Sequence, residues 1–226
     1  MATTYVLIHG AGESGSCWRA VAAELKRYGD TAIAPDLPCD DDLAGLREYA
    51  DAVVDAVESA RVRGRVVVVA HSFGGFTAPQ VAERLEAEEL VLVSAMVPAP
   101  MEPPGDWWEN TGFEDAVRRA ARDDDGLTGN EDPFVCFYHD VPRPIAERAL
   151  AATRQQSGAP VGRPWPLPRW PAVRTRYVLC TGDRFMPAEF ARRMVAERLG
   201  VVPEELETGH MPMLSRPGEL AALLRG

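Results

Sequence analysis

A run of valines that ends in a turn of small residues constrains the fold of this chain more than any other feature. Residues 66–75 read Val-Val-Val-Val-Ala-His-Ser-Phe-Gly-Gly, so an apolar, β-branched segment leads directly into Ser72 and two glycines. The pattern is typical of a nucleophile elbow, in which a buried strand, a sharp turn and a helix present one serine hydroxyl. Ala70 stands where a glycine is usual, and its methyl group is still small. On this pattern alone, an ordinary turn after a strand stays open as the alternative.

Short β-branched segments alternate with segments of helical spacing in the first half of the chain and again towards its end. Strands are predicted at residues 5–8, 31–34, 66–70, 90–94, 177–180 and 204–206, and helices at residues 18–28, 43–57, 75–85, 188–199 and 217–224. Strands that are apolar on both faces and separated by helices indicate an α/β fold with a mostly parallel sheet flanked by helices. A length of 226 residues suits a single domain spanning residues 1–226.

Residues 98–171 have a different texture from the rest of the chain. Prolines cluster in this segment, as do four of the five tryptophans, Trp107, Trp108, Trp165 and Trp170. Helices are predicted at residues 113–122 and 144–153, and no strand alternation is found there. We interpret the segment as a helical cap inserted into the α/β domain.

The charge and cysteine content exclude several classes of function. Lys and Arg number 24 against 34 Asp and Glu, a net charge of −10, which argues against binding to nucleic acid or to an anionic membrane. No apolar run approaches the roughly 18–20 residues of a membrane span, and the first residues lack the pattern of a leader peptide, so we expect a cytoplasmic protein. The four cysteines are scattered without a C-x-x-C pair, so neither a disulfide framework nor a metal site is expected.

A base for the serine is sought among four histidines. His210 lies in a loop between the last predicted strand and the last predicted helix, where an imidazole can reach a serine at the carboxyl edge of the sheet. His9 ends the first strand and is expected to shape the turn below the site. His71 adjoins the serine but points away from it, as a packing residue, and His139 lies in the predicted cap. We therefore assign the base to His210.

The acid is expected to follow a strand at the same edge of the sheet. Asp183 directly follows the predicted strand at residues 177–180 and can accept the second imidazole N–H. Asp36 precedes the elbow, and Asp140 lies in the predicted cap, so both are weaker candidates. The order Ser72, Asp183, His210 is that of α/β-hydrolases.

An oxyanion hole needs two backbone N–H groups near the serine. Phe73, the residue after the nucleophile, supplies the first, and Ala11 in the turn His9-Gly10-Ala11-Gly12 is the candidate for the second. The turn has neither the G-x-G-x-x-G pattern nor a P-loop lysine, so we expect it to bind neither a dinucleotide nor ATP.

With these residues in place, the chain resembles the α/β-hydrolase superfamily. Within it, the chain is most similar to the branch that contains plant methyl esterases and hydroxynitrile lyases and their bacterial relatives. The matching segments are His9-Gly10-Ala11 with Cys17-Trp18, residues 70–75, residues 137–140 and residues 209–217. The resemblance implies a cofactor-free hydrolase with a helical cap over an apolar pocket.

Two departures from that branch affect the expected chemistry. Gly12-Glu13-Ser14 stand where the branch commonly has bulky residues and histidine, which changes the floor of the pocket. The lyases carry a threonine after the strand-end histidine and a lysine after the catalytic one, whereas this chain has Gly10 and Met211. Lyase activity is therefore disfavoured.

The leading hypothesis is hydrolysis of a small, apolar or aromatic carboxylic ester through an acyl-enzyme. Residues expected to line the substrate pocket are Gly12, Trp107, Phe137, Tyr138, His139 and Met211. The cap aromatics can equally serve only to pack the cap on the core. Two other hypotheses stay open: a binding protein that holds a small molecule without turnover, and C–C hydrolase or lyase chemistry at the same site.

Overall fold

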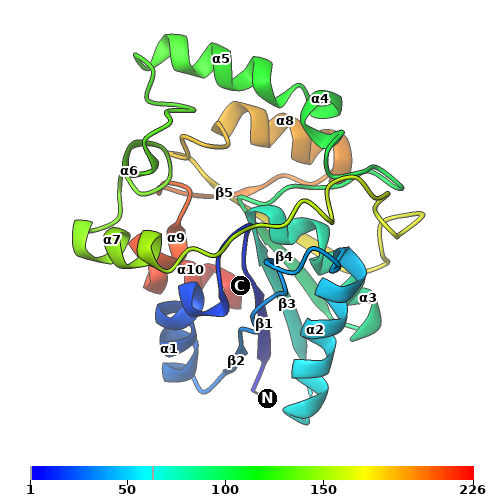
Figure 1. Ribbon diagram of the computed structural model, residues 1–226. Coiled ribbons are helices and arrows are strands. Elements are labelled where there is room, and N and C mark those ends of the chain that lie inside the picture. Colours follow the sequence, from blue (N-terminus) through cyan, green and yellow to red (C-terminus); the bar gives the residue numbers. More distant parts are fainter. Residues whose placement is uncertain (1, 63) are drawn as a thin grey trace.

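Six parallel strands form one central sheet, in the order β2-β1-β3-β4-β5-β6 (Figure 1). The computed structural model describes residues 2–62 and 64–226. The strands are β1 (Thr4–Ile8), β2 (Thr31–Ile33), β3 (Val66–His71), β4 (Glu89–Val93), β5 (Arg174–Cys180) and β6 (Glu204–Leu206). The predicted α/β fold is confirmed, and each predicted strand is present with small differences at its ends.

Helices cover both faces of the sheet because successive side chains of a strand point to opposite sides. Val68 and Ala70 of β3 pack in the core formed with α2 (Leu46–Ser59), α3 (Ala78–Arg84) and α8 (Ala188–Leu199). Val67 and Val69 pack in the core formed with α1 (Arg19–Arg27) and α10 (Pro217–Arg225). The valine run is therefore apolar throughout because each of its faces contacts a helical layer.

The segment between β4 and β5 contains helices and, in its described residues, no strand. Its helices are α4 (Trp107–Thr111), α5 (Phe113–Asp123), α6 (Pro133–Cys136) and α7 (Arg143–Ala151). They lie on the side towards which the strands run (Figure 1). We call residues 98–171 the cap segment; its status as an insertion in one domain stays a prediction. That predicted domain also includes Met1 and Arg63, which lie outside the described residues.

The elbow holds Ser72 in a strained conformation between β3 and α3. Ser72 has a φ of 51°, in the left-handed region that L-residues rarely adopt. Residues Ser72–Phe76 form a 3₁₀ turn, and α3 starts only at Ala78 with Pro79 in its first turn. The predicted helix at 75–85 is thus divided, because Pro79 has no N–H to continue a helix that began earlier.

Two glycines allow this turn to pack against neighbouring backbone. A Cβ on Gly74 would lie 2.7 Å from the carbonyl oxygen of His9, and one on Gly75 would lie 2.0 Å from that of Met96. The N–H of Met96 also donates to the carbonyl of Ser72, at 3.0 Å. The chain after β4 therefore holds the elbow directly, and no side chain fits between them.

We expect the Gly75→Ala variant to lose at least about 2 kcal/mol of unfolding free energy, because its methyl group must displace the Met96 backbone. The matched control is Gly218→Ala in α10, where an added Cβ meets nothing within 4 Å. Urea unfolding of both variants checks the prediction. Equal stability of the two would contradict it.

Candidate active site

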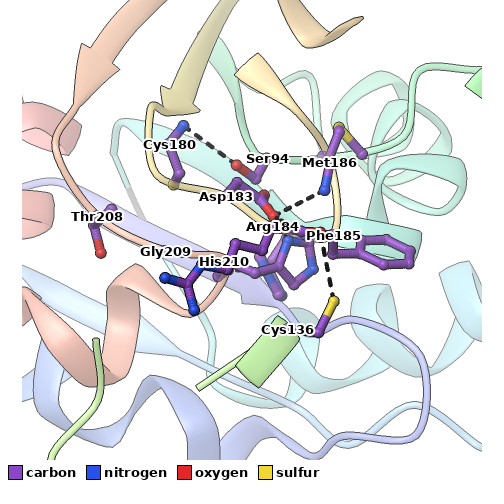
Figure 2. Close-up of polar contacts among 12 residues, drawn as sticks. Ser94, Cys136, Cys180, Asp183, Arg184, Phe185, Met186, Thr208, Gly209 and His210 are labelled. Atoms are coloured by element: carbon purple, nitrogen blue, oxygen red, sulfur yellow. Dashed lines mark hydrogen bonds and ion pairs between the residues drawn. The ribbon is translucent and has the colours of Figure 1, made fainter. Parts of the chain in front are cut away.

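Asp183 and His210 form a buried acid–base pair at the carboxyl edge of the sheet. Asp183 follows β5, and its Oδ1 accepts hydrogen bonds from the N–H groups of Phe185 and Met186, both at 2.8 Å. Its Oδ2 lies 2.7 Å from Nδ1 of His210 (Figure 2). Because the backbone holds one carboxylate oxygen, the other is fixed in place for the imidazole. Nδ1 of His210 then donates to Asp183, and Nε2 is left to act as a base.

Ser72 and His210 line the same cavity, which has a volume of about 270 Å³. The His210 ring packs against Phe185 and Phe137, with centroids 4.9 and 5.5 Å away. Within residues 2–62 and 64–226, no hydrogen bond joins the Ser72 hydroxyl to another residue. The fold thus brings the predicted nucleophile to the cavity onto which the predicted base opens.

The turn after β1 presents one free amide to this cavity. The Gly10 N–H donates to Oε2 of Glu13 at 2.9 Å, and the Gly12 N–H donates to Oε1 of Gln156 at 3.2 Å. Neither the Ala11 N–H nor the Phe73 N–H donates to any group of the described residues. Ala11 also lines the cavity. The two predicted oxyanion donors are therefore the amides that remain available.

His9 supports this turn from below, in agreement with the expectation from the sequence. Its Nε2 lies 2.9 Å from the N–H of Leu37, so Nε2 accepts and Nδ1 must carry the proton that faces the Gly10 carbonyl at 2.8 Å. Burial lowers the pKa of His9, which agrees with a neutral ring. His9 is a structural residue of the turn.

His71 does more than pack, and here the interpretation from the sequence was wrong. Its Nδ1 lies 3.3 Å from Oε2 of Glu13, and its Nε2 lies 2.8 Å from the carbonyl oxygen of His210. Burial alone would raise the pKa of Glu13, but the hydrogen bond and charge of His71 and the Gly10 N–H outweigh it and lower that pKa. The signal in the sequence was the unusual Gly12-Glu13-Ser14, to which only an effect on the floor of the pocket was assigned.

Three of the six predicted pocket residues line the cavity: Phe137, Tyr138 and Met211. Burial, with the nearby Glu13 carboxylate, raises the pKa of Tyr138 to about 12. The sequence did not identify the other side chains that line this cavity, which are Glu13, His71, Pro133, Leu150, Thr153 and Phe185.

The structure places the other three predicted pocket residues elsewhere, and this corrects the expectation. Trp107 is fully buried in the core, where its indole N–H donates to the Val97 carbonyl at 2.9 Å. His139 contacts the carbonyl oxygen of Gly182 through Nε2, at 2.9 Å. Gly12 is a left-handed turn residue whose carbonyl accepts from the Arg154 N–H, at 2.6 Å. Each has a polar partner or packing environment outside the cavity.

The cap segment anchors the loops that carry Asp183 and His210. His139 contacts the loop of Asp183 through Gly182, and Asp140 accepts from the Gly209 N–H and the Thr208 hydroxyl, both at 2.7 Å. Burial alone would raise the pKa of Asp140, but these hydrogen bonds and that of Ser215 outweigh it and lower the pKa. Asp140 therefore holds the backbone beside His210 rather than the imidazole.

Across the described residues, no group of three or more His, Cys, Asp or Glu side chains could hold a metal ion, and all four cysteines are free. No helix among those residues is long and apolar enough to cross a bilayer.

The chain is similar to known proteins over nearly its whole length. The sequence pattern of the Alpha/beta hydrolase family matches residues 5–223. Methylesterase 7 of Arabidopsis thaliana is 26% identical, over 97% of this chain and 94% of its own length. Methyl jasmonate esterase 1 of Vitis vinifera is also 26% identical, over 98% and 95%. The crystal structure of polyneuridine aldehyde esterase has the same fold, with a TM-score of 0.79 at 22% identity over 100% of this chain and 98% of that one.

Replacing Asp140 by Asn is expected to lower the unfolding free energy at pH 7 by about 1–2 kcal/mol, because the charged acceptor is lost. The folded-state pKa of Asp140 lies below its unfolded value, which is about 3.9. The contribution of the carboxylate is therefore complete above that value and is lost as the pH falls through the folded-state pKa. The gap between wild type and D140N should narrow below about pH 4.

Urea unfolding at a series of pH values measures this gap. The matched control is Asp55→Asn, at an exposed position on α2, which should unfold like the wild type. A D140N gap that stays constant across the acid range would contradict the role given to the carboxylate.

Proposed function

The chain belongs to the alpha/beta hydrolase family, and we propose that it hydrolyses a small carboxylic ester with Ser72 as the nucleophile. One observation carries the proposal: the fixed Asp183–His210 pair, 2.7 Å between Oδ2 and Nδ1, opens on the cavity that Ser72 lines. Two relatives that align along nearly the whole chain have esterase names, which supports a carboxylesterase-like enzyme.

The proposed reaction has two halves. Nε2 of His210 takes the Ser72 proton, and the serine oxygen attacks the ester carbonyl, whose oxygen becomes an anion held by the amides of Ala11 and Phe73. His210 then protonates the departing alcohol, which leaves an acyl-enzyme. In the second half, His210 removes a proton from water, and the resulting attack releases the acid and restores Ser72. Each oxyanion donor contributes about 3 kcal/mol in the transition state.

The lining of the cavity supports a small, neutral, apolar or aromatic ester. Its walls include Phe137, Phe185, Leu150 and Met211, and its volume of about 270 Å³ lies at the lower end of the range for ligand pockets. The net charge of −10 opposes the approach of anionic substrates. The proposed catalysis needs no cofactor, and we propose that it takes place in the cytoplasm on a small-molecule substrate.

The Ser72→Ala variant should lose at least about a thousandfold of its turnover of a short-chain nitrophenyl ester and all labelling by a fluorophosphonate, because no other group supplies the nucleophile. The measurements are nitrophenol release and gel detection of the label. Ser59→Ala, at an exposed position at the end of α2, is the matched control and should behave as wild type.

Other outcomes of this experiment identify the alternative functions. Unchanged turnover in S72A would rule out Ser72 as the nucleophile. Ligand binding by the wild type without any ester turnover would favour a binding protein. Turnover of diketones or cyanohydrins, but not of esters, would favour C–C hydrolase or lyase chemistry.

A further inference from the structure

Glu13 connects the turn of residues 10–12 after β1, which we call the oxyanion turn, to the backbone of the proposed catalytic histidine, His210, through His71. Its Oε2 accepts the Gly10 N–H at 2.9 Å and lies 3.3 Å from Nδ1 of His71. On the other side of that ring, Nε2 lies 2.8 Å from the carbonyl oxygen of His210. The His71 ring and Glu13 thus bridge the turn that carries Ala11, a proposed oxyanion donor, and the backbone of His210, the proposed base.

Both neighbours of the His71 ring are hydrogen-bond acceptors. A neutral imidazole has one N–H and could satisfy only the Glu13 carboxylate or the His210 carbonyl. The ring is 1% exposed, so water does not readily supply the missing donor. An unprotonated ring nitrogen would turn its lone pair towards whichever acceptor it faces, so the two contacts call for a proton on both nitrogens. The lowered pKa of Glu13 agrees with an ionised carboxyl group. The contacts are those of a buried ion pair.

This pair lies directly beside the nucleophile. A Cβ placed on Gly10 would lie 3.1 Å from Oε2 of Glu13, 3.1 Å from the Cβ of Ser72 and 3.2 Å from Nδ1 of His71. The three groups therefore surround one point, and a side chain larger than that of glycine there would have to displace them. The centroids of the His71 and His210 rings are 4.7 Å apart.

We propose that Glu13 and His71 form a second acid–histidine pair, with a proton on both ring nitrogens of His71, that positions the oxyanion turn against the backbone of His210. They are positioning residues, since they act through Ala11 and His210. The proposal rests on the proposed esterase function.

The groups that face this pair come from several elements. Asp183 faces it across the His210 ring, and His9 approaches Glu13 from the end of β1. Cys17 lies in η1 (Gly15–Trp18), and Tyr138 lies in the cap segment. Burial and the negative charge of Glu13 raise the pKa values of both residues, so both stay protonated. Neither residue titrates in the acid limb of an activity profile.

The decisive variant is Glu13→Gln, which keeps the shape of the side chain and removes its charge. We expect kcat to fall about tenfold or more with a smaller change in KM, because the oxyanion amide loses its alignment. Glu147→Gln, an exposed acid on α7, is the matched control.

Coupling between the two residues is tested with a double-mutant cycle. If Glu13 and His71 act as one unit, E13Q/H71Q should be no slower than the slower single variant. Urea unfolding of each variant separates lost activity from lost stability. The proposal is overturned if kcat of E13Q equals that of the wild type, or if its activity falls only in proportion to the folded fraction.

A second measurement does not depend on activity. Imidazole ¹⁵N NMR, with the resonances assigned through bonds to the backbone, should show two N–H groups on His71 at pH 7 in the wild type and one in E13Q. A single N–H in the wild type would overturn the proposal even if the enzyme is an esterase. Absence of both ester turnover and fluorophosphonate labelling would instead sink the proposed function and leave the NMR result to decide on the pair.

Discussion

The close backbone packing around the elbow is the constraint on which the rest of the structure depends. Ser72 occupies a left-handed conformation, with a φ of 51°, that costs about 1–3 kcal/mol and persists only when its surroundings enforce it. Gly74 approaches the carbonyl of His9, and Gly75 approaches that of Met96, so β1 and the chain after β4 hold the turn from two sides. The oxyanion turn begins immediately after His9. The same contact that strains the serine therefore also sets the position of the Ala11 amide, which would stabilise the oxyanion formed when Ser72 attacks.

The cap segment also anchors the loops that carry the predicted acid, Asp183, and the predicted base, His210. His139 and Asp140, neighbours in sequence, contact the loops that carry Asp183 and His210 respectively. A Cβ on Gly209 would lie 2.6 Å from a carboxylate oxygen of Asp140, so any larger residue there would have to displace this side chain. The loops of Asp183 and His210 are thus held by one short stretch of chain. Phe137, which lines the cavity, lies two residues before His139 in the same stretch.

The sequence was sufficient wherever a local signal specified the structure. The valine run, the small residues around Ser72 and the strand that precedes Asp183 each depend on neighbours in the chain, and all of them are found where predicted. The pocket was predicted less well because its walls are set by contacts between distant segments. Trp107 carries the same aromatic signal as Phe137, but its indole N–H finds the Val97 carbonyl in the core. His71 was predicted only to pack because the two residues that its ring nitrogens contact, Glu13 and His210, lie 58 and 139 positions away in the chain.

Glu13 gives the strongest reason to treat the oxyanion turn and His71 as one unit. An ionised carboxylate beside a site where a carbonyl oxygen becomes negative would oppose that change, and the low dielectric of a mostly buried site strengthens the repulsion. Its side chain is 13% exposed, so solvent screens it little. A proton on each nitrogen of His71 cancels that charge while leaving the Gly10 N–H bound to the carboxylate. The carboxylate can then shape the turn without a net charge, and this requires both members of the pair.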